Sequence, residues 1–194
     1  MAPPRARRVL VTVGTTRFDA LVRAAAAPDV EAALVARGYT ALRIQVGRGA
    51  APASWGPEAA ADDADAAAGA DGAATPGFRR SWFRFTPDLA TEIVQAALVV
   101  SHAGAGSIME ALAARAPLVV VANDALMDNH QSELALELQA SGHVVVATPK
   151  TLADAIRRVA EAPLVPYPAV DDAAFAKLVD AEVRTERPAS CALL

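Results

Sequence analysis

The stretch Ser101-His102-Ala103-Gly104-Ala105-Gly106-Ser107-Ile108-Met109-Glu110 decides how the rest of this sequence is interpreted. The apolar run before it, residues 96–100, is typical of a buried parallel strand, and residues 108–114 have the composition of a helix. The stretch is therefore predicted to be a strand-to-helix turn. Gly104 and Gly106 carry no side chain, so a ligand can approach the backbone N–H groups there.

The start of this predicted helix favours an anion, because the amides of a first helical turn lack intrahelical partners and the helix dipole attracts negative charge. Glu110 lies three residues beyond Ser107, on the same helix face and one turn deeper. A phosphate would repel this carboxylate, so we expect Glu110 to face neutral hydroxyls such as those of a ribose. The stretch thus predicts a nucleotide pocket. The alternative is that the glycines only let a helix pack tightly on a strand.

Composition limits the fold and the partners of the chain. Its 194 residues, 54% of them hydrophobic, can bury one good core, and two full Rossmann domains would not fit. The net charge is -4 and the arginines at 5, 7 and 8 form no basic stripe, so nucleic acid is not an expected partner. A single cysteine, Cys191, excludes a disulfide within the chain and fits a reducing, cytosolic compartment. No apolar run reaches the roughly 20 residues of a membrane span.

Strand and helix patterns alternate between residues 8 and 161. Strands are predicted over 8–13, 41–46, 81–85, 96–100, 118–121 and 143–147. Helices are predicted over 20–27, 30–37, from the turn at 86–88 to 95, and over 108–114, 132–140 and 152–161, with Asp19 capping the first. This alternation predicts an α/β fold: a Rossmann-like parallel sheet with helices on both faces.

Two of the predicted strands end in small polar loops that contain glycine. Gly14-Thr15-Thr16 follows the first strand and Gly47-Arg48-Gly49 follows the second. In a parallel sheet such loops gather at the carboxyl edge, where ligands bind. A dinucleotide dehydrogenase would carry its glycine fingerprint after the first strand, so the residues there disfavour that class.

Three further segments are expected outside the regular core. Residues 1–7 are interpreted as a disordered N-terminus, and residues 50–77 as a low-complexity surface insertion that Trp55 could pin. Residues 162–194 are predicted to be a Pro-rich linker, an amphipathic helix over 171–183 and a tail. Cys191 begins Cys-Ala-Leu-Leu, which fits a prenylation box, although chance is the alternative because no polybasic stretch precedes it.

Four motifs in order resemble one known family. They are Val11-Thr12-Val13-Gly14-Thr15-Thr16-x-Phe18-Asp19, Gln45-x-Gly47-Arg48-Gly49, Ser101-His102-Ala103-Gly104-Ala105-Gly106-Ser107 and Asn129-His130-Gln131-x-Glu133-Leu134-Ala135. Over residues 8–161 the chain resembles the soluble catalytic subunit of the eukaryotic transferase that makes dolichyl-pyrophosphate chitobiose, a glycosyltransferase family 28 C-terminal domain. More distantly, it is similar to the donor-binding half of the bacterial N-acetylglucosaminyltransferase that acts on the lipid-linked peptidoglycan precursor.

The resemblance implies the donor-binding half of a GT-B glycosyltransferase, with UDP-N-acetylglucosamine as donor. It implies that Ala105, Gly106 and Ser107 contact the diphosphate, that Glu110 contacts the ribose and that His130 and Gln131 lie near the sugar. The uracil is expected near Phe85 and Thr86. The full set expected to bind UDP-N-acetylglucosamine is Gly14, Thr15, Thr16, Gly104, Ala105, Gly106, Ser107, Glu110, Asn129, His130 and Gln131.

The implied reaction is an inverting transfer of N-acetylglucosamine to dolichyl-pyrophosphate-N-acetylglucosamine. The candidate catalytic residues are His102 and His130, although a histidine at a strand end such as His102 can instead organise the loops around it. None of the four motifs contains the Asp-x-Asp pattern that holds a metal and a diphosphate, so neither a metal nor another cofactor is expected.

A membrane-anchored partner subunit is expected to carry the acceptor site. The first strand begins at about Arg8, which leaves no room for an acceptor domain or a membrane anchor in this chain. The resemblance implies docking at the cytosolic face of the endoplasmic reticulum, with the amphipathic helix over 171–183 as the candidate interface. The alternative function is a non-catalytic nucleotide-binding or scaffolding subunit of a membrane complex.

Overall fold

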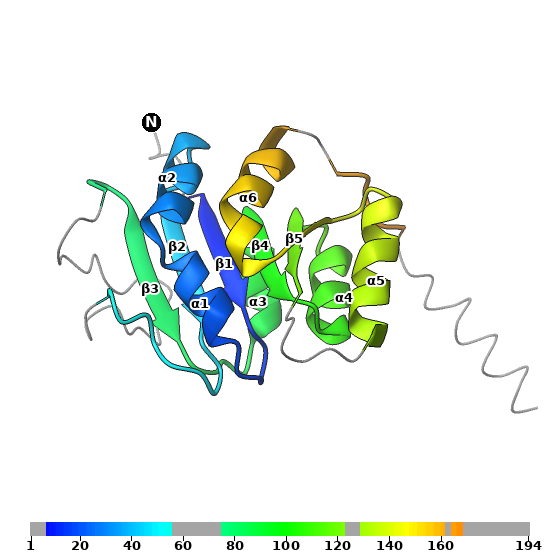
Figure 1. Cartoon of the computed structure of the whole chain (residues 1–194), viewed down its shortest axis with the longest axis horizontal. Coiled ribbons are helices and arrows are strands. Elements are labelled where there is room, and N and C mark those ends of the chain that lie inside the picture. The colour runs from blue at the N-terminus through cyan, green and yellow to red at the C-terminus, as the bar shows by residue number, and fades with distance from the viewer. Residues whose placement is uncertain (1–6, 56–74, 123–128, 162–163, 169–194) are drawn as a thin grey trace, which may run out of the picture.

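The computed structural model describes residues 7–55, 75–122, 129–161 and 164–168. Within these residues, six strands form one sheet in the order β3-β2-β1-β4-β5-β6, and every neighbouring pair is parallel (Figure 1). The strands are β1 (Arg8–Thr12), β2 (Ala41–Gln45), β3 (Arg79–Phe83), β4 (Leu98–His102), β5 (Leu118–Val121) and β6 (Val145–Ala147). The Rossmann-like parallel sheet predicted from the sequence is confirmed.

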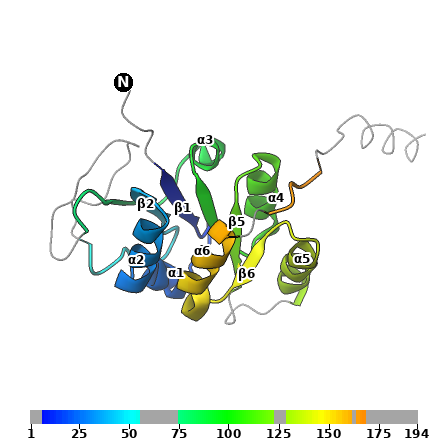
Figure 2. The same ribbon diagram turned by 90° about the horizontal axis from the view of Figure 1, so that it is seen from above.

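Helices cover both faces of this sheet. They are α1 (Asp19–Ala25), α2 (Pro28–Ala36), α3 (Leu89–Val94), α4 (Ala105–Ala113), α5 (Asn129–Ala140) and α6 (Leu152–Glu161), with a 3-10 turn, η3 (Pro149–Thr151), before α6. Figure 2 shows α1, α2 and α6 on one side of the sheet and α3 and α4 on the other. None of the helices in the described segments has the length and apolar character that a bilayer crossing requires.

The central strands are buried on both faces, so their side chains feed two separate cores. In β1, Val9 and Val11 pack with residues of α1, α2 and α6, whereas Leu10 packs with residues of α3, α4 and α5. This alternation follows from the two-residue repeat of a strand. It also explains why the strands appear in the sequence as continuous apolar runs instead of alternating ones.

The boundary between β4 and α4 differs from the predicted one. Ser101 and His102 belong to β4, where Ser101 pairs with Thr12 of β1 and with Val120 of β5. α4 begins at Ala105, three residues before the predicted start. The predicted loop therefore shrinks to Ala103 and Gly104, because the ladder continues through two polar residues and the first helical turn contains no large apolar side chain to reveal it.

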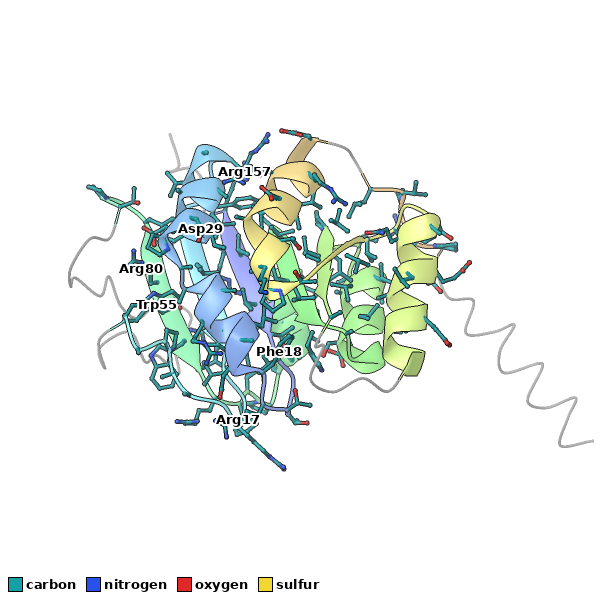
Figure 3. All side chains as sticks on the ribbon, in the orientation of Figure 1. Arg17, Phe18, Asp29, Trp55, Arg80 and Arg157 are labelled. Carbon is teal, nitrogen blue, oxygen red and sulfur yellow. The ribbon has the colours of Figure 1, made fainter. Side chains whose placement is uncertain are left out.

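The two ends of the low-complexity segment are fastened to one buried ion pair. Glu31 of α2, which is 6% exposed, accepts hydrogen bonds from Arg80 Nε (2.6 Å) and from the N–H and hydroxyl of Thr75 (3.0 and 2.9 Å). The Arg80 guanidinium lies 6.0 Å from the ring centre of Trp55, and both residues are labelled in Figure 3. Trp55 is buried, so its predicted anchoring role is confirmed. Residues 56–74 of the predicted 50–77 insertion lie outside the described part of the chain.

Candidate functional site

The loops that carry most of the predicted site residues share one edge of the molecule. Because all described strands are parallel, the loops after β1, β2, β3 and β4 lie at the carboxyl edge, at the bottom of Figure 1. The chain leaves β1 toward α1 on one face and leaves β4 toward α4 on the other. The boundary between β1 and β4 is therefore the topological switch point, where open α/β sheets bind their ligands.

The amino end of α4 lies at this switch point. Gly104 is the N-cap residue, and no side-chain hydrogen bond caps the helix there. A Cβ atom built on Gly106 would meet no heavy atom within 4 Å, and Gly106 has a helical backbone, so neither packing nor conformation within the described residues requires glycine. Glycine in a helix is less stable than alanine by about 1 kcal/mol. What glycine provides at this position is open space beside the amides of the first turn.

Ser107 and Glu110 lie on the outer side of α4. Ile108 and Ala111 of the same helix are fully buried in the core, whereas Ser107 is half-buried and Glu110 is exposed. This arrangement agrees with the expected common face of Ser107 and Glu110. The contact of Glu110 with a ribose stays a prediction.

The loop after β1 is tightly turned. Gly14 has a φ of +61°, and its N–H donates to the hydroxyl of Thr12 (3.1 Å). The hydroxyl and the N–H of Thr16 both donate to the carbonyl of Val13 (2.8 and 3.3 Å), whereas Thr15 is exposed. Of the two threonines, Thr15 is therefore the one whose side chain is directed to solvent at this edge.

The glycines after β2 serve packing between loops. A Cβ atom on Gly47 would lie 2.5 Å from the carbonyl oxygen of Thr16, and one on Gly49 would collide with the carboxylate of Asp19. These two positions are therefore glycine because the loop after β2 packs closely against the residues that follow β1. Their sequence pattern did not indicate this packing.

From the sequence we expected Asp19 to cap α1, but it does not. It is the first residue of the helix, and its carboxylate accepts hydrogen bonds from the N–H of Ala50 (3.0 Å) and from Arg17 Nε (2.7 Å). The Ala50 hydrogen bond, followed by the Arg17 hydrogen bond, lowers the pKa of Asp19 below 3.8. Asp19 therefore ties the loop after β2 to the start of α1.

The sequence analysis missed Arg84, which joins the loops after β2 and β3. Its guanidinium donates to the carbonyls of Gly49 (3.1 Å) and Gly47 (3.5 Å) and lies 5.9 Å from the ring centre of Trp82. In the sequence, Arg84 stands between two aromatic residues, and this alternation indicates only a strand with one face in solvent. The partner carbonyls of Gly47 and Gly49 are 37 and 35 residues away in the sequence and left no local sign.

Phe85 and Thr86, the expected uracil residues, follow β3 at the same edge. The ring of Phe85 is 52% exposed, which is unusual for an aromatic residue and leaves it available for stacking. The Thr86 hydroxyl accepts a hydrogen bond from the N–H of Asp88 (3.2 Å), and Asp88 caps α3 through the N–H of Thr91 (2.9 Å). Contact of these residues with a base stays a prediction.

His102 ends β4 beside these loops. Its Nδ1 atom is buried and has no hydrogen-bond partner among the described residues. Burial lowers the pKa of His102, and the nearby backbone of Thr12 raises it by less. The imidazole is therefore neutral at pH 7.

The remaining predicted residues are placed only in part. Residues 129–131 form the start of α5, whose amino end lies at the carboxyl edge in Figure 1, but their side chains are outside the described part of the structure. The same holds for Cys191 and for the predicted helix over 171–183. The sugar contacts, His130 as a catalytic residue and prenylation thus remain predictions.

A cavity of about 320 Å³ lies away from these residues, at the amino edge of the sheet. It is lined by Leu112, Arg115, Ala116, Pro117, His143, Val159, Leu164, Val165, Pro166 and Tyr167. Since Pro117 immediately precedes β5 and His143 precedes β6, this cavity and the switch point are at opposite ends of the strands.

Known proteins with similar sequences identify the family. A model of the glycosyltransferase family 28 C-terminal domain matches residues 8–184. The UDP-N-acetylglucosamine transferase subunit ALG13 of Homo sapiens is 40% identical over 144 residues, which are 74% of this chain but only 11% of the human protein. The subunit of the same name from Eremothecium gossypii is 37% identical over 185 residues, which are 89% of this chain and 91% of that protein.

Solved structures agree with this comparison. The solution NMR structure of ALG13 has a TM-score of 0.64 and 25% identity, covering 90% of this chain and 95% of that one. MurG from Acinetobacter baumannii has a TM-score of 0.53 and 18% identity, covering 81% of this chain and 41% of that one, and it shares the fold. From its sequence match and its fold, this chain belongs to the glycosyltransferase family 28 C-terminal domain family.

Proposed function

We propose that this chain is the donor-binding, catalytic subunit of an inverting N-acetylglucosaminyltransferase that uses UDP-N-acetylglucosamine. The acceptor is dolichyl-pyrophosphate-N-acetylglucosamine, so the reaction is the second step of N-glycan precursor assembly. The names of the relatives support the donor, since they are called UDP-N-acetylglucosamine transferase subunits.

The observation that carries this proposal is the amino end of α4 at the switch point. No side chain caps the helix, and Gly106 leaves open space beside the first-turn amides. Three N–H groups, those of Ala105, Gly106 and Ser107, are placed to donate to the diphosphate of the donor.

The rest of the donor extends from this anion site along the carboxyl edge. Glu110, exposed on the outer side of α4, accepts hydrogen bonds from the ribose hydroxyls. Phe85 and Thr86 lie against the uracil, and residues 129–131 hold the sugar. From the loop after β1, Thr15 faces the phosphates with its side chain and Thr16 with its backbone.

The chemistry needs charge stabilisation more than covalent catalysis. The acceptor hydroxyl attacks the anomeric carbon from the face opposite UDP, a general base takes its proton, and the bond from the anomeric carbon to the phosphate oxygen breaks. The diphosphate gains negative charge as it leaves, and the fixed amides and dipole of α4 stabilise that charge. These amides act without an essential divalent cation, so chelation of metals should leave transfer unchanged.

The acceptor lipid requires a membrane-bound partner, and we assign the interface to residues 171–194. The relatives are named as subunits, which supports an assembly. Deleting residues 171–194 should abolish capture by the partner at the cytosolic face of the endoplasmic reticulum while leaving UDP affinity within about twofold. Capture at wild-type strength after the deletion would place the interface elsewhere.

The test is donor binding by calorimetry, with UDP-N-acetylglucosamine, UDP-glucose and NAD as ligands. Losing the charged hydrogen bonds of Glu110 to a ribose costs about 2 to 4 kcal/mol, so Glu110→Ala should weaken donor binding about 30-fold or more. Glu137→Ala on α5 removes another exposed carboxylate and is the matched control, with no expected change.

Gly106→Ala separates the anion site from the stability of the fold. A methyl group at Gly106 meets open space and replaces a helical glycine, so the free energy of unfolding should rise by about 0.4–1 kcal/mol. The same methyl group narrows the approach to the amides, so donor affinity should fall. Unchanged donor affinity in both Gly106→Ala and Glu110→Ala would mean that the donor does not bind at the amino end of α4. No donor binding by wild type, alone or with its membrane partner, would favour a scaffolding subunit over a catalytic one.

A further inference from the structure

The imidazole of His102 fills space that side chains would need at two glycines in different loops. A Cβ atom built on Gly14 would lie 2.7 Å from His102 Cε1 and 3.3 Å from Nε2. A Cβ atom built on Gly104 would lie 2.8 Å from the same Cε1 atom and still closer to Nε2. Both positions must therefore be glycine while the ring stays where it is, and one end of the ring contacts both loops.

These two glycines belong to the elements that face each other across the switch point. Gly14 opens the loop after β1 in a left-handed conformation, with φ at +61°. Gly104 is the N-cap of α4, and its N–H donates to the carbonyl of His102 itself (2.8 Å). The ring thus fixes how closely the loop after β1 approaches the first turn of α4.

The two ring nitrogens of His102 lie in different surroundings. Nδ1 is buried without a partner in the described structure, and Nε2 occupies the space that a Cβ atom of Gly104 would need. A general base needs a nitrogen within hydrogen-bond reach of the proton that it removes. The buried Nδ1 atom does not meet this requirement, whereas the fit of the ring between two glycines is what a spacer needs.

The loop that the His102 ring contacts is itself packed against neighbouring loops. The loop after β1 is packed against Gly47, whose Cβ atom would lie 2.9 Å from the carbonyl oxygen of Gly14. Arg84 then joins Gly47 and Gly49 to the end of β3. A shift at His102 therefore moves the loop after β1 relative to α4, and the loop after β2 resists that movement.

We propose that His102 is a positioning residue, whose ring holds the Gly14 loop and the amino end of α4 at the separation that the donor diphosphate requires. It acts on the diphosphate only through the amides of residues 105–107. This inference rests on the proposed function, because it explains what holds the amides of the same proposed anion site in position.

The test measures UDP binding by the full chain for wild type, His102→Ala and His102→Phe, with urea unfolding of each variant. A positioning role predicts that His102→Ala weakens UDP binding at least 10-fold and that His102→Phe, a flat ring without nitrogen, restores it to within about 3-fold of wild type. A catalytic base predicts the opposite pattern. UDP affinity would then be unchanged in both variants, and kcat of the assembled enzyme would fall in both without recovery in His102→Phe.

A second set of variants covers the case in which His102→Ala unfolds or the Phe ring is too large. Gly104→Ala should lose UDP binding because its methyl group meets the ring, and Gly104→Ala combined with His102→Ala should bind UDP more tightly than Gly104→Ala alone. Equal loss in the single and double variants would overturn the proposal.

The wild type separates this inference from the proposed function. If wild type fails to bind UDP, alone or with its membrane partner, the proposed function fails. If wild type binds UDP and His102→Ala binds it equally well, only the positioning role of His102 fails.

Discussion

The carboxyl and amino edges of the same sheet are held together in different ways. At the carboxyl edge, glycines allow backbone and ring atoms to approach closely, and Asp19 and Arg84 bridge the loops with hydrogen bonds. At the amino edge, residues 164–167 cross the ends of the strands, where the Val165 N–H donates to the Gly142 carbonyl (3.0 Å) and the rings of His143 and Tyr167 meet at 5.1 Å.

This difference between the two edges indicates where the chain tolerates substitutions. The amino edge is lined mainly by apolar side chains, which can shift, and it retains a cavity of about 320 Å³. At the carboxyl edge the loops are close together, so a Cβ atom added at Gly14, Gly47, Gly49 or Gly104 meets a neighbouring loop, the Asp19 carboxylate or the His102 ring. The carboxyl edge therefore presents backbone amides in fixed positions. An anion site that must not rearrange requires such fixed amides.

Alanine at a left-handed glycine on each edge should give the largest contrast. Gly14→Ala combines positive φ with a collision against His102, so the free energy of unfolding should fall by about 3 kcal/mol. Gly142→Ala also has positive φ, at +75°, but its nearest neighbour is a methyl group of Val165 at 3.2 Å, so the loss should be about 1–2 kcal/mol. Urea unfolding measures both, and equal losses would remove the contrast between the edges.

The pH dependence of stability should report on the Asp19 tether. Folding lowers the pKa of Asp19 below 3.8, so the unfolded chain binds the proton more readily. Its contribution is complete well above that value and is lost as the pH falls through the folded pKa. Asp19→Asn should lower the free energy of unfolding by about 1–2 kcal/mol at pH 7, with a smaller difference from wild type at pH 3.

Glu137→Gln, which changes an exposed carboxylate on α5, is the control for the pH measurement. A deficit of Asp19→Asn that stays the same at pH 3 and pH 7 would show that the charge of Asp19 does not carry the tether.

The smallest expected effect is a gain in stability at the amino edge. α4 ends with hydrogen bonds from the N–H of Arg115 to Leu112 and from Ala116 to Ala111, which leaves Arg115 with a φ of 54°. Glycine is favoured in this left-handed position after a helix. Arg115→Gly should raise the free energy of unfolding by about 0.5–1 kcal/mol in urea, without changing UDP affinity. A loss of stability would mean that the Arg115 side chain contributes to the cavity wall more than its backbone strain costs.

Much of the architecture was predictable because apolar side chains reveal buried strands. β5 has the predicted bounds, and the alternation of strands and helices gave the parallel sheet. The start of α4 was not predictable from apolar periodicity, since Ala105, Gly106 and Ser107 contribute no large side chain to the core. In the sequence, the amides that we propose to bind the donor were therefore located by the glycines and not by the helix pattern.

The errors at the site have a common physical origin in contacts between distant loops. Gly104 was interpreted as opening the backbone to a ligand, and the structure adds that it accommodates His102. Asp19 was expected to serve its own helix and instead binds Ala50. A single sequence shows that a glycine or a carboxylate stands at a position, but it does not show which residue from another loop meets it.

The Glu31 ion pair has a practical consequence for protein engineering. Because Thr75 binds Glu31 and Arg80 joins Glu31 to Trp55, the folded domain itself brings together the points where residues 56–74 leave and rejoin the described structure. Loop-closure entropy changes by only about 0.6 kcal/mol for each doubling of length. Residues 56–74 are therefore the place to graft a purification tag, a fluorescent reporter or a short synthetic linker, with the proposed anion site at the carboxyl edge left intact.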